Sequence, residues 1–103
     1  MLKHQEATQK MLGTFPESFQ LDPQTRVLHL IEEAAELATA VSKHQGRFPV
    51  KIKEGELEES FGGLLFDIFT LATQLNIDIE KIYPNELKKF SKYSAKKFEQ
   101  SGS

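Results

Sequence analysis

Apolar residues recur at helical spacing in four segments, and these segments predict four helices. We expect them at residues 2–13, 23–45, 54–75 and 84–98. Asp22-Pro23 is a helix-start signal, because Asp favours the N-cap and Pro favours the first helical position. Pro84 is expected to begin the last helix after a short turn, since proline interrupts a helix interior. The pattern therefore predicts an all-α fold, a bundle of about four helices.

The helix predicted at residues 54–75 is apolar over most of its circumference. Its polar positions form one narrow stripe, made of Glu56, Ser60, Gly63, Asp67, Thr70 and Gln74. In a short chain such a helix indicates a bundle interior plus a subunit interface, because it is usually buried on more than one side. Gly62-Gly63 either lets another backbone approach or divides the segment into two helices. Asp67 is either buried with a partner or a metal, or exposed on this polar stripe.

Composition and charge restrict the class of protein. The 103 residues suit one domain, which we expect at residues 1–98 with a flexible tail at 99–103. A net charge of -2 gives no drive toward nucleic acid polymers or an anionic membrane. The absence of cysteine excludes disulfides and thiolate ligands, and no apolar run approaches a membrane span. The N-terminus lacks the apolar core of a signal peptide, so we expect a cytoplasmic protein.

Glu32, Glu33 and Glu36 gather in the helix predicted at residues 23–45. The apolar arc of this helix consists of Val27, Leu30, Ala34, Leu37, Ala38 and Val41. Glu33 lies at the edge of the arc with Glu36 about 60° further round, whereas Glu32 points away from it. Glu33 and Glu36 share one face, and like charges so placed repel unless a cation lies between them. The pair is either a divalent cation site, which suits Mg²⁺, or a solvated acidic face.

A basic stripe lies on the helix predicted at residues 84–98. Lys88 and Lys92 share one side of this helix, and Asn85 joins them. This side either holds phosphate groups or places cations near the helix C-terminus, where cations suit the helix dipole.

Two segments carry a resemblance to a known family. Residues 30–38 read Leu-Ile-Glu-Glu-Ala-Ala-Glu-Leu-Ala, and residues 56–66 read Glu-Leu-Glu-Glu-Ser-Phe-Gly-Gly-Leu-Leu-Phe. In this order, with a basic last helix after them, they resemble the MazG-type all-α nucleotide pyrophosphohydrolases over about residues 26–92. The resemblance implies an α-helical bundle assembled as a dimer or a dimer-based tetramer.

The resemblance also implies a reaction and a metal. It implies Mg²⁺-dependent hydrolysis of nucleoside triphosphates between the α and β phosphates, which gives a monophosphate and pyrophosphate. Glu33 and Glu36 match the metal-binding glutamates of the first motif, and Glu32 matches its accessory acidic position. The second motif of the family, Glu-x-x-Asp, supplies the other metal ligands from the facing helix.

The second motif is incomplete in this chain. Ser60 stands at its glutamate position and Gly63 at its aspartate position. Asp67 lies one turn beyond Gly63 on the same stripe and leans back toward it, across an axial offset of about 6 Å. The lean recovers only part of this offset, so the geometry does not favour a relocated site. Such a site would place Glu33, Glu36 and Asp67 around Mg²⁺, with Lys88, Lys92 and Asn85 on phosphate, and it is the arrangement that an active enzyme would need.

Three functions follow from the sequence. The first is a divergent nucleoside triphosphate pyrophosphohydrolase that uses this relocated site. The second is a catalytically degraded MazG-like protein that binds a nucleotide or a protein partner without turnover. The third is a helical assembly module whose acidic pairs only decorate the surface. A carboxylate cluster facing a shared groove would favour the first, and Glu33 and Glu36 in bulk solvent would favour the third.

Overall fold

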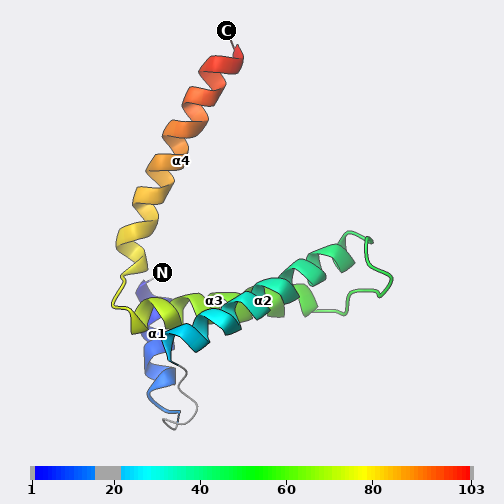
Figure 1. Ribbon diagram of the computed structural model, residues 1–103, viewed down its shortest axis with the longest axis vertical. Helices are drawn as coiled ribbons and strands as arrows, with labels where there is room; N and C mark the ends of the chain where they lie inside the picture. The colour runs from blue at the N-terminus through cyan, green and yellow to red at the C-terminus, as the bar shows by residue number, and fades with distance from the viewer. Residues whose placement is uncertain (1, 16–21, 103) are drawn as a thin grey trace.

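The chain forms four helices in the computed structural model, which describes residues 2–15 and 22–102, with side chains at 3–15 and 22–93. The helices are α1 (Leu2–Leu12), α2 (Pro23–His44), α3 (Glu56–Gln74) and α4 (Ile79–Gly102). No strand occurs within these described ranges. The prediction of an all-α fold is therefore confirmed, and α2 and α3 lie side by side as its most extensive helix pair (Figure 1).

α2 begins and ends close to where the sequence predicted. The Asp22 side chain accepts a hydrogen bond from the Thr25 N–H at 2.9 Å, and Pro23 occupies the first helical position. The helix ends at His44, and Gly46 then adopts a positive φ of 72°, a conformation that favours glycine. The start signal that the sequence offered for this helix is confirmed, and the helix ends one residue before the predicted end at residue 45.

α3 is continuous, and the backbone fixes its end. The helix runs through Gly62 and Gly63, which excludes the two-helix alternative. At the C-terminal end Asn76 adopts a left-handed φ of 57°, which asparagine tolerates better than most residues. The Ile77 N–H then donates to the Ala72 carbonyl at 2.8 Å and satisfies one acceptor of the last turn. This turn directs the chain out of α3 and into α4.

α4 begins earlier than the sequence predicted. We expected a turn before Pro84 and a helix starting at that residue, but α4 includes Pro84 in its interior. Asp78 explains the difference, because its side chain accepts the Glu80 N–H at 3.0 Å and so supports an earlier helix start. Pro84 lies in the second turn, where it removes only one intrahelical donor. α4 also continues to Gly102, beyond the helix end expected at residue 98.

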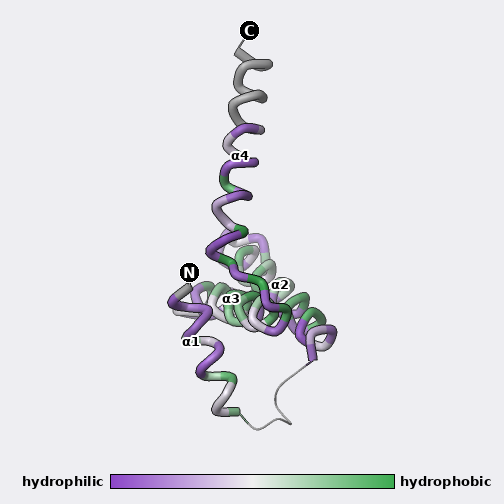
Figure 2. Tube along the Cα trace, turned by 90° about the vertical axis from the view of Figure 1, so that its left-hand side faces the viewer, coloured by the Kyte–Doolittle hydropathy of each residue, from purple (hydrophilic) through white to green (hydrophobic). Residues whose placement is uncertain are grey.

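The core of the single chain is small. Phe69, Ala72 and Ile79 form its buried apolar cluster, where α3 meets the start of α4. α1 packs on α3, and the Gln5 side chain donates to the Ile77 carbonyl at 2.8 Å. The radius of gyration is 17.6 Å, against about 13 Å for a compact chain of this length. The difference reflects α4, which projects away from the other helices (Figures 1 and 2).

Many apolar side chains are exposed in the single chain. α2 turns Arg26, Glu33 and Ala40 toward α3, so part of its predicted apolar arc, including Val27, faces solvent instead. The large exposed apolar residues of α2 and α4 are Val27, Leu28, Ile31, Ile82, Tyr83, Leu87, Phe90 and Tyr93. The subunit interface expected from the sequence stays a prediction. Among the described residues, no helix is both long and apolar enough to cross a membrane.

Candidate active site

The two acidic segments of the sequence meet across a groove between α2 and α3. The groove has a volume of about 460 Å³ and is lined by Glu33, Glu36, Thr39, Lys43, Glu56, Glu59, Ser60 and Gly63. Glu33 and Glu36 come from α2, and Ser60 and Gly63 come from α3, so the two motif segments face one another as the sequence predicted. The acidic pair of α2 therefore belongs to a shared groove, which is the arrangement expected of a binding site.

Glu33 occupies the space beside Gly63. A Cβ atom at Gly63 would lie 3.0 Å from the Glu33 Cδ and closer still to its Oε2. Side-chain carbons do not approach other atoms so closely, so a side chain at position 63 and the present position of Glu33 exclude each other. At Gly62 a Cβ atom would meet nothing within 4 Å. The missing side chain at position 63 therefore allows Glu33 to lean across the groove toward α3.

Asp67 lies on α3 and takes two partners from α2. Its Oδ1 accepts a hydrogen bond from the Arg26 Nη1 at 2.9 Å, and its Oδ2 lies 2.6 Å from the His29 Nδ1. The Asp67 and Arg26 side chains are 0% and 6% exposed, whereas the His29 side chain is 43% exposed. Arg26 also lies over the Phe66 ring, 5.9 Å from its centroid. Asp67 is thus the buried carboxylate with a partner, and the alternative of an exposed Asp67 is excluded.

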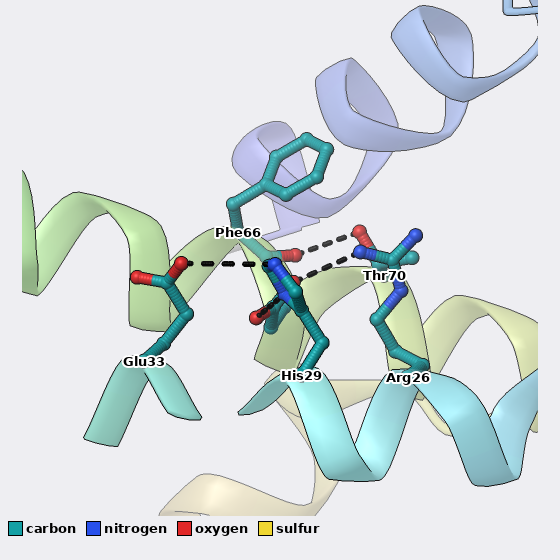
Figure 3. Close-up of polar contacts among 6 residues, drawn as sticks. Arg26, His29, Glu33, Phe66 and Thr70 are labelled. Carbon is teal, nitrogen blue, oxygen red and sulfur yellow. Dashed lines mark hydrogen bonds and ion pairs between the residues drawn. The ribbon is translucent and has the colours of Figure 1, made fainter. Parts of the chain in front are cut away.

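His29 connects this buried network to the groove. Its Nε2 lies 3.8 Å from the Glu33 Oε1, one helical turn along α2 (Figure 3). Ligand atoms of His29, Glu33 and Asp67 all lie within 4.8 Å of one another, close enough to surround a metal ion. Figure 3 also shows the Thr70 hydroxyl donating to the Phe66 carbonyl, at 2.7 Å, behind this cluster. The structure therefore brings Asp67 and Glu33 together, and it adds a histidine between them.

The groove perturbs the acidity of two of its carboxylates in opposite directions. Burial raises the pKa of Glu33 above its ordinary value, and the negative charge of Glu36 raises it further, while His29 acts against both. The Lys43 Nζ donates to the Glu56 Oε2 at 2.9 Å, and this hydrogen bond lowers the pKa of Glu56. Negative charge is therefore compensated at the Glu56 end of the groove and accumulates at the Glu33 end.

A family model described as the MazG nucleotide pyrophosphohydrolase domain matches residues 21–98. The chain belongs to the MazG family. The protein YpjD of Bacillus subtilis (strain 168) is 32% identical over 89 residues, which cover 84% of this chain and 79% of YpjD. The crystal structure of Bacillus subtilis YpjD matches with a TM-score of 0.76 at 32% identity, covering 87% of this chain and 91% of that one.

A further solved structure carries an activity in its description. It is the crystal structure of the Bacillus-conserved MazG protein, a nucleotide pyrophosphohydrolase, and it matches with a TM-score of 0.71 at 28% identity. The match covers 85% of each chain. The resemblance that we drew from the two motif segments is therefore confirmed for the family and the fold.

In this MazG chain the predicted site residues are only partly brought together. Glu33 and Glu36 line the groove, and Glu32 is exposed outside the groove lining. Asp67 is directed to Arg26 and His29 and does not line the groove. The residues predicted to hold phosphate lie exposed on α4, which leads away from the groove within one chain: Lys88, Lys92 and Asn85 (Figure 1).

Three residues at this MazG site were missed in the sequence. His29 precedes Glu33 by four residues, a spacing that places two ligand side chains on one helix face. Lys43 follows Glu36 by seven residues, which is close to two turns, so it shares the face of that glutamate. Both spacings are signals in the sequence that place these side chains on the helix face of the two glutamates. Arg26 carried no such signal, because its partner lies 41 residues away on another helix.

Proposed function

We propose that this MazG chain is a Mg²⁺-dependent nucleoside triphosphate pyrophosphohydrolase. It would cleave the substrate between the α and β phosphates and release a nucleoside monophosphate and pyrophosphate. The observation that carries the proposal is the groove between α2 and α3, which combines Glu33 and Glu36 with the cation of Lys43 in a MazG fold. Such a groove offers carboxylates to a metal ion and an ammonium group to a phosphate chain.

The residues of the groove suit Mg²⁺. In nucleotide-processing sites Mg²⁺ is usually held by one or two carboxylates together with substrate phosphates, and Glu33 and Glu36 supply that number from one helix face. Their mutual repulsion contributes to the raised pKa of Glu33, and a cation between them would relieve it. The carboxylates that α3 brings to the groove lining are Glu56 and Glu59. Glu56 is already engaged by Lys43, which leaves Glu59 to approach from that side.

The proposed reaction assigns roles to Glu33, Glu36 and Lys43 of the groove and to Glu32 outside it. When bound, Mg²⁺ supplies neutralisation of the phosphate charge and a lowered pKa of the attacking water. Glu33 and Glu36 would hold that ion at one end of the groove, and Glu32, outside the groove lining, would act as an accessory acidic residue. Lys43 is positioned for the phosphate chain, because its ammonium lines the same groove and needs only to leave Glu56.

Product analysis tests the proposal. The full chain is incubated with each common nucleoside triphosphate and Mg²⁺, and monophosphate and pyrophosphate are quantified by ion-exchange chromatography. Glu36→Gln should abolish turnover while leaving the helical circular dichroism spectrum unchanged, because Glu36 is exposed and fills no core position. Glu58→Gln is the matched control, since Glu58 is an exposed glutamate of α3 outside the groove lining. Full activity in Glu36→Gln, or no pyrophosphate from any substrate with the natural chain, would refute the proposal.

We also infer that the active form is a homodimer or a dimer of dimers. The support is the small core of the single chain and the exposed apolar side chains of α2 and α4. A second copy would cover such surfaces, since burial of apolar area is the main driving force of association. In this arrangement α4 of a second copy would bring Lys88, Lys92 and Asn85 to a groove that their own chain leaves out of reach.

Subunit mixing tests this assembly. The mass in solution is first measured by light scattering after gel filtration, and Leu28→Glu should lower it toward the monomer, because Leu28 is 63% exposed on α2. Inactive Glu36→Gln and a Lys88→Ala/Lys92→Ala variant are then mixed. Recovery of activity would mean that one copy supplies the groove and the other supplies α4. An active chain that is monomeric would contradict the proposed oligomer. Two variants that assemble without recovery of activity would contradict the proposal that α4 of a second copy completes the groove.

A further inference from the structure

The buried Asp67 fixes the hydrogen on one nitrogen of His29. Arg26 is permanently charged and donates to one oxygen of Asp67, and a carboxylate paired with such a cation accepts hydrogen bonds. The His29 Nδ1, at 2.6 Å from the other oxygen, must therefore be the donor. In the neutral ring this places the free lone pair on Nε2. The network of α2 and α3 thus selects one tautomer of His29 and holds its ring in place.

The free nitrogen of His29 points to Glu33. The distance from Nε2 to the Glu33 Oε1 is 3.8 Å, which is too long for a hydrogen bond. Two ligands on a shared ion, each about 2.0–2.2 Å from it, lie roughly 3–3.5 Å apart, so a small rotamer change would close the pair on a metal. The His29 side chain is 43% exposed, so an ion has access from solvent. Glu36 follows Glu33 by three residues and shares its helix face.

We propose that His29 Nε2 and Glu33, with Glu36, form a first-row transition-metal site in which Asp67 and Arg26 support the histidine from behind. A ligating histidine that donates its other N–H to a carboxylate is the usual outer-shell arrangement of such sites. An imidazole ligand favours Co²⁺, Ni²⁺ or Zn²⁺ over Mg²⁺, which prefers oxygen ligands. Nitrogen from α2 thus replaces part of the carboxylate set that Ser60 and Gly63 no longer supply from α3.

This inference rests on the proposed function for the role of the ion, because Glu33 and Glu36 belong to the same groove, but binding can be measured without substrate. The probe is Co²⁺, titrated into the full chain without nucleotide and followed by calorimetry and by its visible absorption. We expect Co²⁺ to bind more tightly than Mg²⁺ under the same conditions. The absorption spectrum should indicate a nitrogen ligand that disappears in His29→Gln.

Two variants and one control separate the roles. His29→Gln removes the imidazole but keeps an amide that donates to Asp67, so it should weaken Co²⁺ binding without unfolding the chain. Asp67→Asn should weaken it by about 10–100-fold, the usual effect of losing an outer-shell partner, provided circular dichroism shows a folded helix content. His44→Gln is the control, because His44 is exposed at the end of α2. It should bind Co²⁺ as the natural chain does.

The outcomes distinguish this inference from the proposed function. Co²⁺ binding that is unchanged in His29→Gln, or Mg²⁺ binding as tight as Co²⁺ binding, would overturn the inference even if the chain hydrolyses nucleotides with Mg²⁺. A chain that binds Co²⁺ through His29 but releases no pyrophosphate would leave the site intact and overturn the proposed activity alone.

Discussion

Removing the carboxylate of Asp67 should destabilise the fold more than removing its cationic partner. Asp67→Leu leaves the Arg26 side chain, which is 6% exposed, without its ion-pair partner. Its Nε already has no hydrogen-bond partner among the described residues, and the guanidinium lies over the Phe66 ring, 5.9 Å from the ring centroid. Breaking a buried pair in this way costs about 3–5 kcal/mol. That is a large share of the roughly 5–15 kcal/mol by which a domain is stable.

The converse substitution should be milder. Arg26→Met removes the guanidinium but leaves Asp67 with His29, whose Nδ1 lies 2.6 Å from its Oδ2. We expect a cost of about 1–3 kcal/mol, the range for one lost partner of a buried polar group. The double variant Arg26→Met/Asp67→Leu should recover most of the loss, because well-packed apolar side chains replace a buried ion pair at little or no cost.

Urea unfolding followed by circular dichroism at a fixed protein concentration measures all four chains of this cycle. The free energy of unfolding of the double variant should exceed that of Asp67→Leu by at least about 2 kcal/mol, because the two residues are coupled within one network. Two results would refute the reasoning. One is a loss below about 1 kcal/mol in Asp67→Leu, the range of an exposed pair. The other is a double variant whose loss equals the sum of the single losses.

Three further predictions follow from the helix ends and the groove. Gly62→Ala should stabilise α3 by up to about 1 kcal/mol, whereas Gly63→Ala should stabilise it less or destabilise it, because the new Cβ displaces Glu33. Urea unfolding of the two variants measures the difference, and equal stabilisation would contradict the close approach of Glu33 to position 63. Asp22→Ala should lower the melting temperature at neutral pH, and Asp22→Asn should not. The folded pKa of Asp22 is depressed below 3.8, so the difference in melting temperature between the natural chain and Asp22→Ala should shrink as the pH falls through the folded pKa. Glu33→Gln should raise the melting temperature at pH 7 more than at pH 4. The folded pKa of Glu33 is raised above 4.5, so ionisation of Glu33 destabilises the natural chain as the pH rises from 4.5 through the folded pKa. A difference in melting temperature between the two chains that does not depend on pH would contradict this reasoning.

A local signal in the sequence accounts for the start of α2, and the family resemblance accounts for the groove. Asp22-Pro23 fixes the helix start through a hydrogen bond within three residues, so it needs no knowledge of the rest of the chain. The facing of residues 30–38 and 56–66 followed from the family resemblance, and the structure confirms it. The predicted start of α4 was wrong, because the Asp78 side chain accepts the Glu80 N–H and the helix begins before Pro84.

The buried network was not accessible from the same reasoning. The sequence allowed Asp67 to be either buried or exposed. The register between α2 and α3 determines that Asp67 is buried beside Arg26. That register is set by side-chain packing between elements about 40 residues apart, which periodicity within one helix does not encode. The same holds for the apolar arc of α2, part of which faces solvent because Arg26 and Glu33 are directed toward α3.

The charge of the groove connects the incomplete second motif, at Ser60 and Gly63, with the proposed role of His29 as a metal ligand. Arg26 neutralises Asp67 and Lys43 neutralises Glu56, so among the described carboxylates that line the groove Glu33, Glu36 and Glu59 keep negative charge for an ion. A set with fewer carboxylates attracts a divalent cation less strongly, so oxygen ligands alone would depend on the phosphates of a nucleotide. A neutral imidazole adds a strong ligand without adding repulsion between carboxylates. The buried pair that fixes His29 therefore compensates, from α2, for ligands that α3 no longer provides.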